Sequence, residues 1–200
     1  MKSNNVFRLT AFTLAGNFAW AIGNLLLGVW MPSAWFFTVG LYFLALSFAR
    51  FIVLLTKRRA NERFLYRFTG GVLIGLALPL AGIVVLTSVR DRGTRFHMIL
   101  MIAIACYAFV KITVAIVNLV RTRKERAPAI TVLGNISLAD ALVSIATLQR
   151  SMLVSFEGMT AVEIRIFNIA TGTAVCLAVL ALGLYLVCQS KQKRKQTLTE

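Results

Sequence analysis

The chain has 200 residues, of which 58% are hydrophobic and only 14% are charged, and its mean hydropathy is +0.79. A soluble domain has about 25% charged residues, so this composition excludes an ordinary water-soluble globular domain. The net charge of +15 would suggest nucleic acid as a partner of a soluble protein, but here the basic residues cluster mainly in short loops between apolar stretches.

The apolar stretches have the length of about 20 residues that a helix needs to cross a bilayer core of about 30 Å. They predict an all-α polytopic membrane protein with a single integral membrane domain over residues 1–200 and no nucleic-acid partner. Six transmembrane helices and a basic cytoplasmic tail at 189–200 are expected, with spans at about 9–30, 34–55, 69–89, 97–120, 130–150 and 161–188.

The first span begins like a signal peptide, but its apolar run continues to Trp30, so we expect no cleavage. Asn17 and Asn24 lie on one small, polar face of this span, which favours hydrogen bonds to neighbouring helices over ligand binding. In the second span, Arg50 lies seven residues before Lys57, about 10 Å from the interface. Its side chain is therefore expected to extend to the cytoplasmic headgroups, a role favoured over substrate contact.

In the third span, Gly71 and Gly75 form a pattern that lets another helix backbone approach closely. Pro79 lies in the middle of this span and removes one helix hydrogen bond, which predicts a kink. His97 opens the fourth span at the outer interface. It has no second histidine or carboxylate cluster beside it, so no metal site is predicted.

The fourth and fifth spans form a hairpin with one ionisable residue in each helix. Lys111 lies ten residues before Arg121 and Asp140 lies ten residues after Ile130. Both are therefore about 15 Å from the basic turn between the helices, near the middle of the bilayer. Because an unpaired charge at that depth costs several kcal/mol, we expect Lys111 and Asp140 to approach within salt-bridge or single-water distance.

Polar side chains continue the face around each charge, and two interpretations remain open. In one, Asp140 takes up a proton or cation, and Lys111 either sets how readily Asp140 is protonated or competes with the bound cation. In the other, a fixed ion pair holds two helices in register. The helix faces carry Tyr107 and Asn118 beside Lys111, and Ser137, Ser144, Thr147 and Ser151 beside Asp140. The candidate intramembrane polar site is Lys111, Asp140, Asn118, Ser137, Ser144 and Tyr107, with Arg50, Asn17 and Asn24 as secondary members.

The start of the sixth helix and the distribution of basic residues set the expected topology. Thr160 and Glu163 fit a capping box, which predicts a helix beginning near Ala161. With six spans, 15 of the 22 Lys and Arg residues lie on the side of the termini and five on the other, so both termini are expected in the cytoplasm. Anionic lipid headgroups are the expected partners of the basic clusters, at Lys57, Arg58, Arg59, Arg123, Lys124, Lys191, Lys193, Arg194 and Lys195.

Enzyme signatures are missing from the sequence, which has no HExxH, GxSxG or Walker A motif and no paired carboxylates within the spans. No catalytic residue, metal or cofactor is therefore predicted. The three cysteines lie in apolar spans without a CxxC motif and are interpreted as small apolar residues; they are Cys106, Cys176 and Cys188.

A pattern that runs from Trp35 through Tyr42 and Ser47 to Arg50 and Phe51, and continues at 141–144 and 148–149, resembles a group of small bacterial polytopic membrane proteins with no assigned function. The resemblance implies a multi-pass protein of the bacterial cytoplasmic (inner) membrane and supplies no site.

The leading hypothesis is a small ion or solute transporter or channel that uses the Lys111–Asp140 pair. The alternatives are a non-catalytic scaffold or accessory subunit, acting as a homo-oligomer or with a partner membrane protein, and a lipid-modifying enzyme, which the missing motifs disfavour. A polar cavity reaching Asp140 would favour the first hypothesis. A closed bundle with small residues facing lipid would favour the second.

Overall fold

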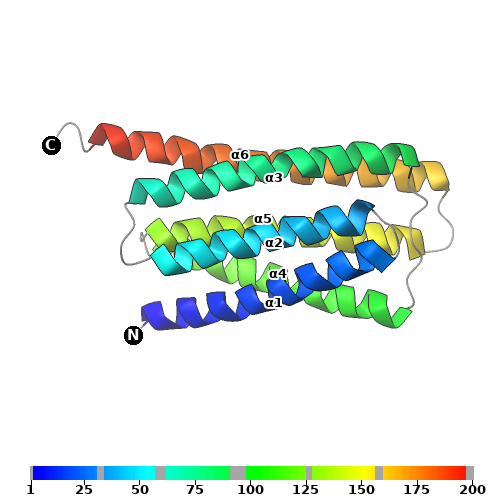
Figure 1. Cartoon of the computed structure of the whole chain (residues 1–200), viewed down its shortest axis with the longest axis horizontal. Helices are drawn as coiled ribbons and strands as arrows, with labels where there is room; N and C mark the ends of the chain where they lie inside the picture. The colour runs from blue at the N-terminus through cyan, green and yellow to red at the C-terminus, as the bar shows by residue number, and fades with distance from the viewer. Residues whose placement is uncertain are drawn as a thin grey trace.

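The computed structural model is a bundle of six long α-helices that alternate in direction along the chain (Figure 1). It describes residues 2–30, 34–56, 62–90, 98–124, 128–155 and 160–196. The helices are α1 (Lys2–Trp30), α2 (Ala34–Thr56), α3 (Glu62–Arg90), α4 (Met98–Lys124), α5 (Pro128–Ser155) and α6 (Ala161–Gln196). The predicted all-α class is confirmed.

Four of these helices are long and apolar enough to cross a membrane, judged on the residues described. Their apolar stretches are Ala34–Thr56 in α2, Glu62–Val85 in α3, Pro128–Leu153 in α5 and Ala161–Gln192 in α6, and α4 adds a shorter one, Ala105–Val120. Large apolar side chains cover the outside of the bundle, among them Leu26, Phe48, Leu78 and Leu177, each at least 60% exposed. A surface of this kind suits lipid rather than water.

The helices lie in three layers of two. α2 and α5 lie in the middle of the bundle, with α3 and α6 on one side and α1 and α4 on the other (Figure 1). The N-terminal end of α1 and the C-terminal end of α6 lie at the same end of the bundle (Figure 1). Polar side chains on the inner faces of α2 and α5 are therefore enclosed by protein, whereas the outer helices meet the surroundings.

Helices α3 and α6 pack closely at two glycines. A Cβ atom built on Gly70 would lie 2.9 Å from the carbonyl oxygen of Gly183, and one on Gly183 would lie 3.0 Å from that of Gly70. Gly71 and Gly75, which the sequence pattern singled out, have no atom within 4 Å of such a Cβ. The close approach is thus made one residue earlier, and the predicted glycine pair faces outward from the bundle.

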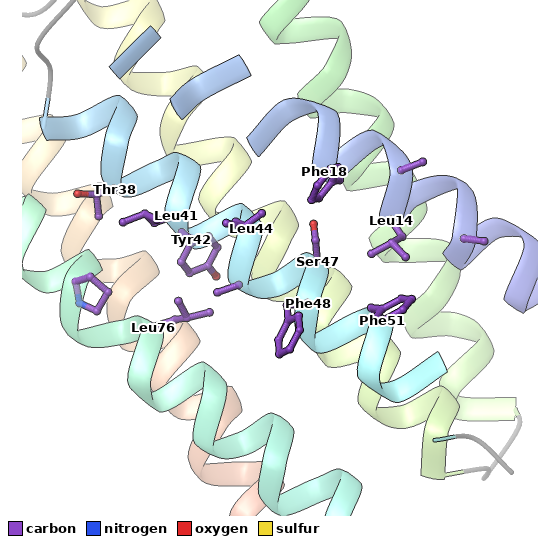
Figure 2. A pocket seen from close by; sticks show the side chains of 14 residues that line it. Leu14, Phe18, Thr38, Leu41, Tyr42, Leu44, Ser47, Phe48, Phe51 and Leu76 are labelled. Atoms are coloured by element: carbon purple, nitrogen blue, oxygen red, sulfur yellow. The ribbon is translucent and has the colours of Figure 1, made fainter. Parts of the chain in front are cut away.

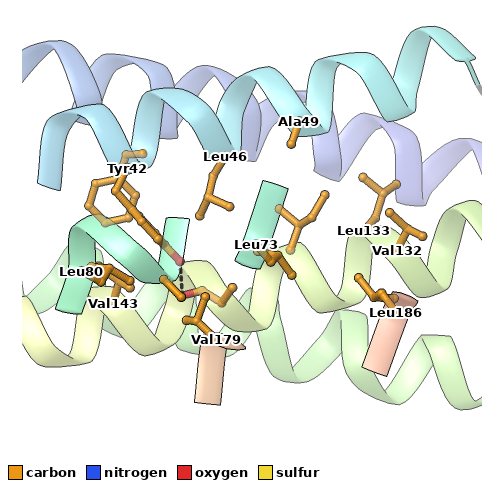
Figure 3. Close-up of a cluster of buried hydrophobic side chains, with 14 of the residues drawn as sticks. Tyr42, Leu46, Ala49, Leu73, Leu80, Val132, Leu133, Val143, Val179 and Leu186 are labelled. Carbon is orange, nitrogen blue, oxygen red and sulfur yellow. Dashed lines mark hydrogen bonds between the residues drawn. The ribbon is translucent and has the colours of Figure 1, made fainter. Parts of the chain in front are cut away.

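The apolar core lies between the central helices and the α3–α6 pair (Figure 3). Leu46 of α2, Leu73 of α3, Val179 of α6 and Leu186 of α6 are fully buried. Tyr42 lies among them and donates a hydrogen bond of 3.4 Å to the carbonyl of Ala139 on α5 (Figure 3). The core therefore fixes α2 against α5, two of the three helices that carry the charges described below.

Several helices extend beyond the predicted apolar spans. α3 begins at Glu62 rather than near residue 69, so Arg63 and Arg67, which lie between the second and third predicted spans, are helical rather than in a loop. α6 continues to Gln196, so the predicted tail is helical over 189–196. The predicted helix ends lie where each run of apolar residues stops. Lys, Arg and Gln are good helix formers, however, and continue a helix past its apolar stretch.

The predicted capping box at the start of α6 is confirmed. The backbone amide of Thr160 donates to the Glu163 carboxylate at 2.8 Å, and the amide of Glu163 donates to the Thr160 hydroxyl at 3.3 Å. These bonds satisfy two amides that a helix start leaves free. α6 begins at Ala161, as expected.

The structure does not test the expectations for Pro79, His97 and most of the basic clusters. α3 runs through Pro79 as one helix, so the proline does not end it, and the kink stays a prediction. His97 and the basic residues Lys57, Arg58 and Arg59 lie outside the described residues. The side chains of the remaining basic clusters also lie outside them, except that of Lys191, which is exposed.

A buried charge cluster as the candidate functional site

Asp140 of α5 lies at the centre of a buried cluster of three charges. The Lys111 ammonium of α4 is 2.7 Å from Oδ1 of Asp140, and the Arg50 guanidinium of α2 is 2.8 Å from Oδ2. The exposed fractions of the residues are 3% for Asp140, 7% for Lys111 and 1% for Arg50. The predicted contact between Lys111 and Asp140 is confirmed, and a second cation shares the same carboxylate.

The expectation that Arg50 extends to the headgroups is wrong. α2 is a central helix, and the face that carries Arg50 also carries the buried residues Phe43 and Ser47 and points into the bundle. The sequence indicates that Arg50 lies nearer the interface than Asp140, and the arginine side chain is long enough to reach across that difference in depth. With an acceptor inside the bundle, the guanidinium is held by the carboxylate rather than by the interface.

A hydrogen-bond chain connects Asp140 to α1. The Asn17 amide donates to Oδ2 of Asp140 at 2.6 Å and accepts a hydrogen bond of 3.0 Å from the Tyr107 hydroxyl. Asn17 therefore forms the interhelical bonds that its sequence position predicted. Asn24 does not, because its amide donates to the Trp20 carbonyl of its own helix at 2.8 Å.

On the other side of the cluster, Asn118 of α4 donates to the Ser137 hydroxyl of α5 at 3.0 Å. Arg50 also reaches that hydroxyl, at 3.4 Å. The other hydroxyls predicted beside Asp140 form hydrogen bonds within their own helix. Ser144, Thr147 and Ser151 each donate to the carbonyl four residues earlier. The structure thus joins Asn118 and Ser137 to the cluster, and gives the remaining hydroxyls local bonds.

Two aromatic rings enclose the Lys111 ammonium. Its nitrogen lies 3.7 Å from the ring centroid of Phe43 and 4.6 Å from that of Tyr107. At such distances the ring faces attract a cation. Phe43 has no place among the candidate residues predicted from sequence, because an apolar aromatic in an apolar span gives no signal until a cation is seen against it.

The cluster has one more positive charge than negative. Among the described residues, no acceptor lies within hydrogen-bond distance of the Nε and Nη1 atoms of Arg50, although both are buried. Both carboxylate oxygens of Asp140 are occupied, and a further cation would meet two fixed positive charges. This arrangement disfavours the earlier interpretation in which Asp140 takes up a cation.

A separate groove of about 940 Å³ runs along α1, α2 and α3 (Figure 2). Its walls are almost entirely apolar and include Leu14, Phe18, Phe48 and Leu76. None of the three charged residues of the cluster lines it. The groove suits an acyl chain of the surrounding lipid, and it is not the polar cavity that would have connected Asp140 to water.

No protein-family model matches this chain, and no curated protein sequence matches it, so the functional inference rests on the geometry of the cluster.

Proposed function

We propose that this chain is a six-span protein of the bacterial inner membrane, with both termini in the cytoplasm, and that it transports or conducts a small ion or solute. The charge cluster is its central site. The observation that carries the proposal is that Asp140 binds side chains from three other helices, through Asn17 of α1, Arg50 of α2 and Lys111 of α4.

A fixed register between two helices needs only one ion pair. Here a movement of α1, α2 or α4 relative to α5 would break a bond to Asp140 and expose an unpaired charge. An ion that binds Arg50 or Lys111 in place of Asp140 would therefore bind one helix arrangement better than another, which is the requirement for coupling binding to a conformational change. Ionisable residues inside a membrane bundle commonly mark such sites.

The proposed topology rests on several independent observations. Four helices are apolar enough to cross, and the alternating directions of all six place the N-terminal end of α1 and the C-terminal end of α6 at the same end of the bundle (Figure 1). The basic residues gather on the side of those ends, by 15 to five. Cytoplasmic loops carry this excess in membrane proteins.

The test is solute flux in vesicles of phosphatidylethanolamine and phosphatidylglycerol that contain the purified protein. Gradients of sodium, potassium, protons and halide are applied in turn, and the vesicle response is compared with that of protein-free vesicles. We expect flux in at least one gradient. It should be lost in the triple variant Arg50→Gln, Lys111→Met, Asp140→Asn, which removes all three charges without leaving one unpaired.

Gly71→Ala is the matched control, because it changes the outer face of α3 and leaves the cluster intact. It should retain flux. Equal rates with and without protein in every gradient would overturn the transport proposal, and so would unchanged flux in a folded triple variant.

A second candidate is a scaffold or accessory subunit. The closed cluster and the outward face of Gly71 and Gly75 favour it, since small residues let another helix approach closely. Under this candidate, Gly71→Leu should change the size of the complex in mild detergent, whereas neutralising the cluster should not. The transport proposal expects the opposite pattern of sensitivity.

A further inference from the structure

We propose that the cluster binds a small monovalent anion of halide size, held by the Arg50 guanidinium and the Ser137 hydroxyl. This inference names the substrate class of the proposed transport site and rests on that function for its physiological role, but the binding itself can be tested without flux.

The first argument is charge. The predicted spans contain two of the seven Asp and Glu residues: Asp140 in the cluster, and Glu163, which is exposed at the start of α6 and is bonded to Thr160. The cluster therefore sets two cations against one carboxylate, and no other carboxylate in the spans can balance the second cation. A surplus positive charge is costly inside a membrane, and one monovalent anion neutralises it.

The second argument is the set of unused donors. Arg50 uses Nη2 for Asp140 and Ser137, whereas its buried Nε and Nη1 meet no acceptor among the described residues. The Ser137 hydroxyl accepts from Asn118 and Arg50 and donates to none of the described side chains or carbonyls. A buried arginine is expected to satisfy its donors, so these groups are placed for a ligand that accepts hydrogen bonds.

The third argument is burial. Arg50 is flanked on α2 by Leu46, Ala49 and Val53, each no more than 1% exposed, and Phe43 covers the neighbouring ammonium. The ring contacts leave Lys111 to contribute charge rather than a second set of donors. One surplus charge in a buried surround matches a single small monovalent anion better than a divalent one.

The experiment measures how bromide affects thermal unfolding of the full chain in detergent. Sodium bromide replaces sodium gluconate at constant ionic strength, so that general screening does not change. The unfolding midpoint should rise saturably with bromide. At a bromide concentration ten times its dissociation constant, the ratio of unfolded to folded protein should fall by about elevenfold, since a ligand specific for the folded state changes it by the factor 1 + [L]/Kd.

Two variants test the site. Arg50→Lys keeps the positive charge but lacks the Nε and Nη1 donors, and it should weaken bromide binding by at least about tenfold, as expected for losing hydrogen bonds to a charged group. Lys111→Met removes the surplus charge and leaves the Arg50–Asp140 pair intact, and it should abolish the bromide dependence. Arg165→Lys, on the exposed surface of α6, is the matched control and should behave as the unaltered chain.

An unfolding midpoint that is the same in bromide and gluconate would overturn the inference, and so would an equal rise in all variants. If the variants of the cluster fail to fold, anomalous diffraction from crystals of the unaltered chain grown in bromide decides the matter. A bromide peak within hydrogen-bond distance of Arg50 supports the inference, and no peak there overturns it. Bromide binding without flux in vesicles would contradict only the proposed transport function, whereas flux without bromide binding would contradict only this inference.

Discussion

Arg50 and Asp140 lie 2.8 Å apart and join the two central helices of the bundle, α2 and α5. The second oxygen of the same carboxylate binds Lys111 of α4 at 2.7 Å. One acidic side chain thus neutralises at most one of two buried cations. This imbalance determines how the protein should respond to substitution at each of the three positions.

Asp140→Asn should be the most destabilising of the single changes in the cluster. It leaves two buried cations without a counter-ion, and breaking a buried ion pair typically costs on the order of 3–5 kcal/mol. Lys111→Met should cost less, because it also removes the surplus buried charge and leaves the Arg50–Asp140 pair balanced. The losses are the hydrogen bond to Asp140, worth about 1.5–3 kcal/mol, and the cation–ring attraction of about 0.5–2 kcal/mol. The free energy of unfolding in mixed detergent micelles measures both. Equal losses for the two variants would contradict the shared role of Asp140.

The cluster also changes an expectation for multiple substitutions. A double variant that neutralises Lys111 and Asp140 should recover less stability than it would if the two formed an isolated ion pair, because Arg50 then remains unpaired. Adding Arg50→Gln to that double variant should restore the folded fraction, since no unpaired charge is left. Full recovery in the double variant alone would show that Arg50 does not depend on Asp140.

Asn17→Leu should destabilise the bundle more than Tyr107→Phe. The first change removes a hydrogen bond to a carboxylate, which is worth about 1.5–3 kcal/mol, and the second removes a hydrogen bond between neutral groups, worth about 0.5–1.5 kcal/mol. Because the two side chains are in contact, their effects should not add in the double variant. Additive effects in a double-mutant cycle would argue against a continuous chain from Tyr107 through Asn17 to Asp140.

Gly70→Ala and Gly71→Ala should have opposite effects although the residues are neighbours. A Cβ on Gly70 meets the backbone of α6 at 2.9 Å, so the helices must separate, at a cost of about 1–3 kcal/mol for overpacking. Gly71 has free space, and alanine there should stabilise α3 by up to about 1 kcal/mol through helix propensity. Thermal unfolding of the two variants side by side makes the comparison. A loss at Gly71 equal to that at Gly70 would contradict the described α3–α6 contact.

Labelling from outside should distinguish the two ends of α6. In a chain whose three cysteines are replaced, a cysteine at Gln192 should not react with a membrane-impermeant maleimide in intact cells, because the basic bias sets that end in the cytoplasm. A cysteine at Val162, at the other end of the same helix and 66% exposed, should react and serves as the control. Reaction at Gln192 in intact cells would reverse the proposed orientation.

The sequence alone determined the helical class, the approximate positions of all six helices, the capped start of α6 and the pairing of Lys111 with Asp140. These features follow from local properties: the length of apolar runs, the spacing of cap residues, and the depth of each residue along a helix of constant rise. Depth is a one-dimensional quantity, so two charges at matched depth on consecutive antiparallel helices could be paired without knowing the fold.

Only the tertiary structure decided which helices lie at the centre, and therefore which way Arg50 points. The sequence fixes a residue's distance from the interface but not the direction of its helix face, and an arginine near an interface reaches headgroups or a buried carboxylate depending on that direction. The same reason explains why Phe43 joined the cluster and why Gly70, rather than Gly71, forms the close contact. Each of these outcomes depends on the rotation of one helix against another, which is set by packing between residues far apart in the chain.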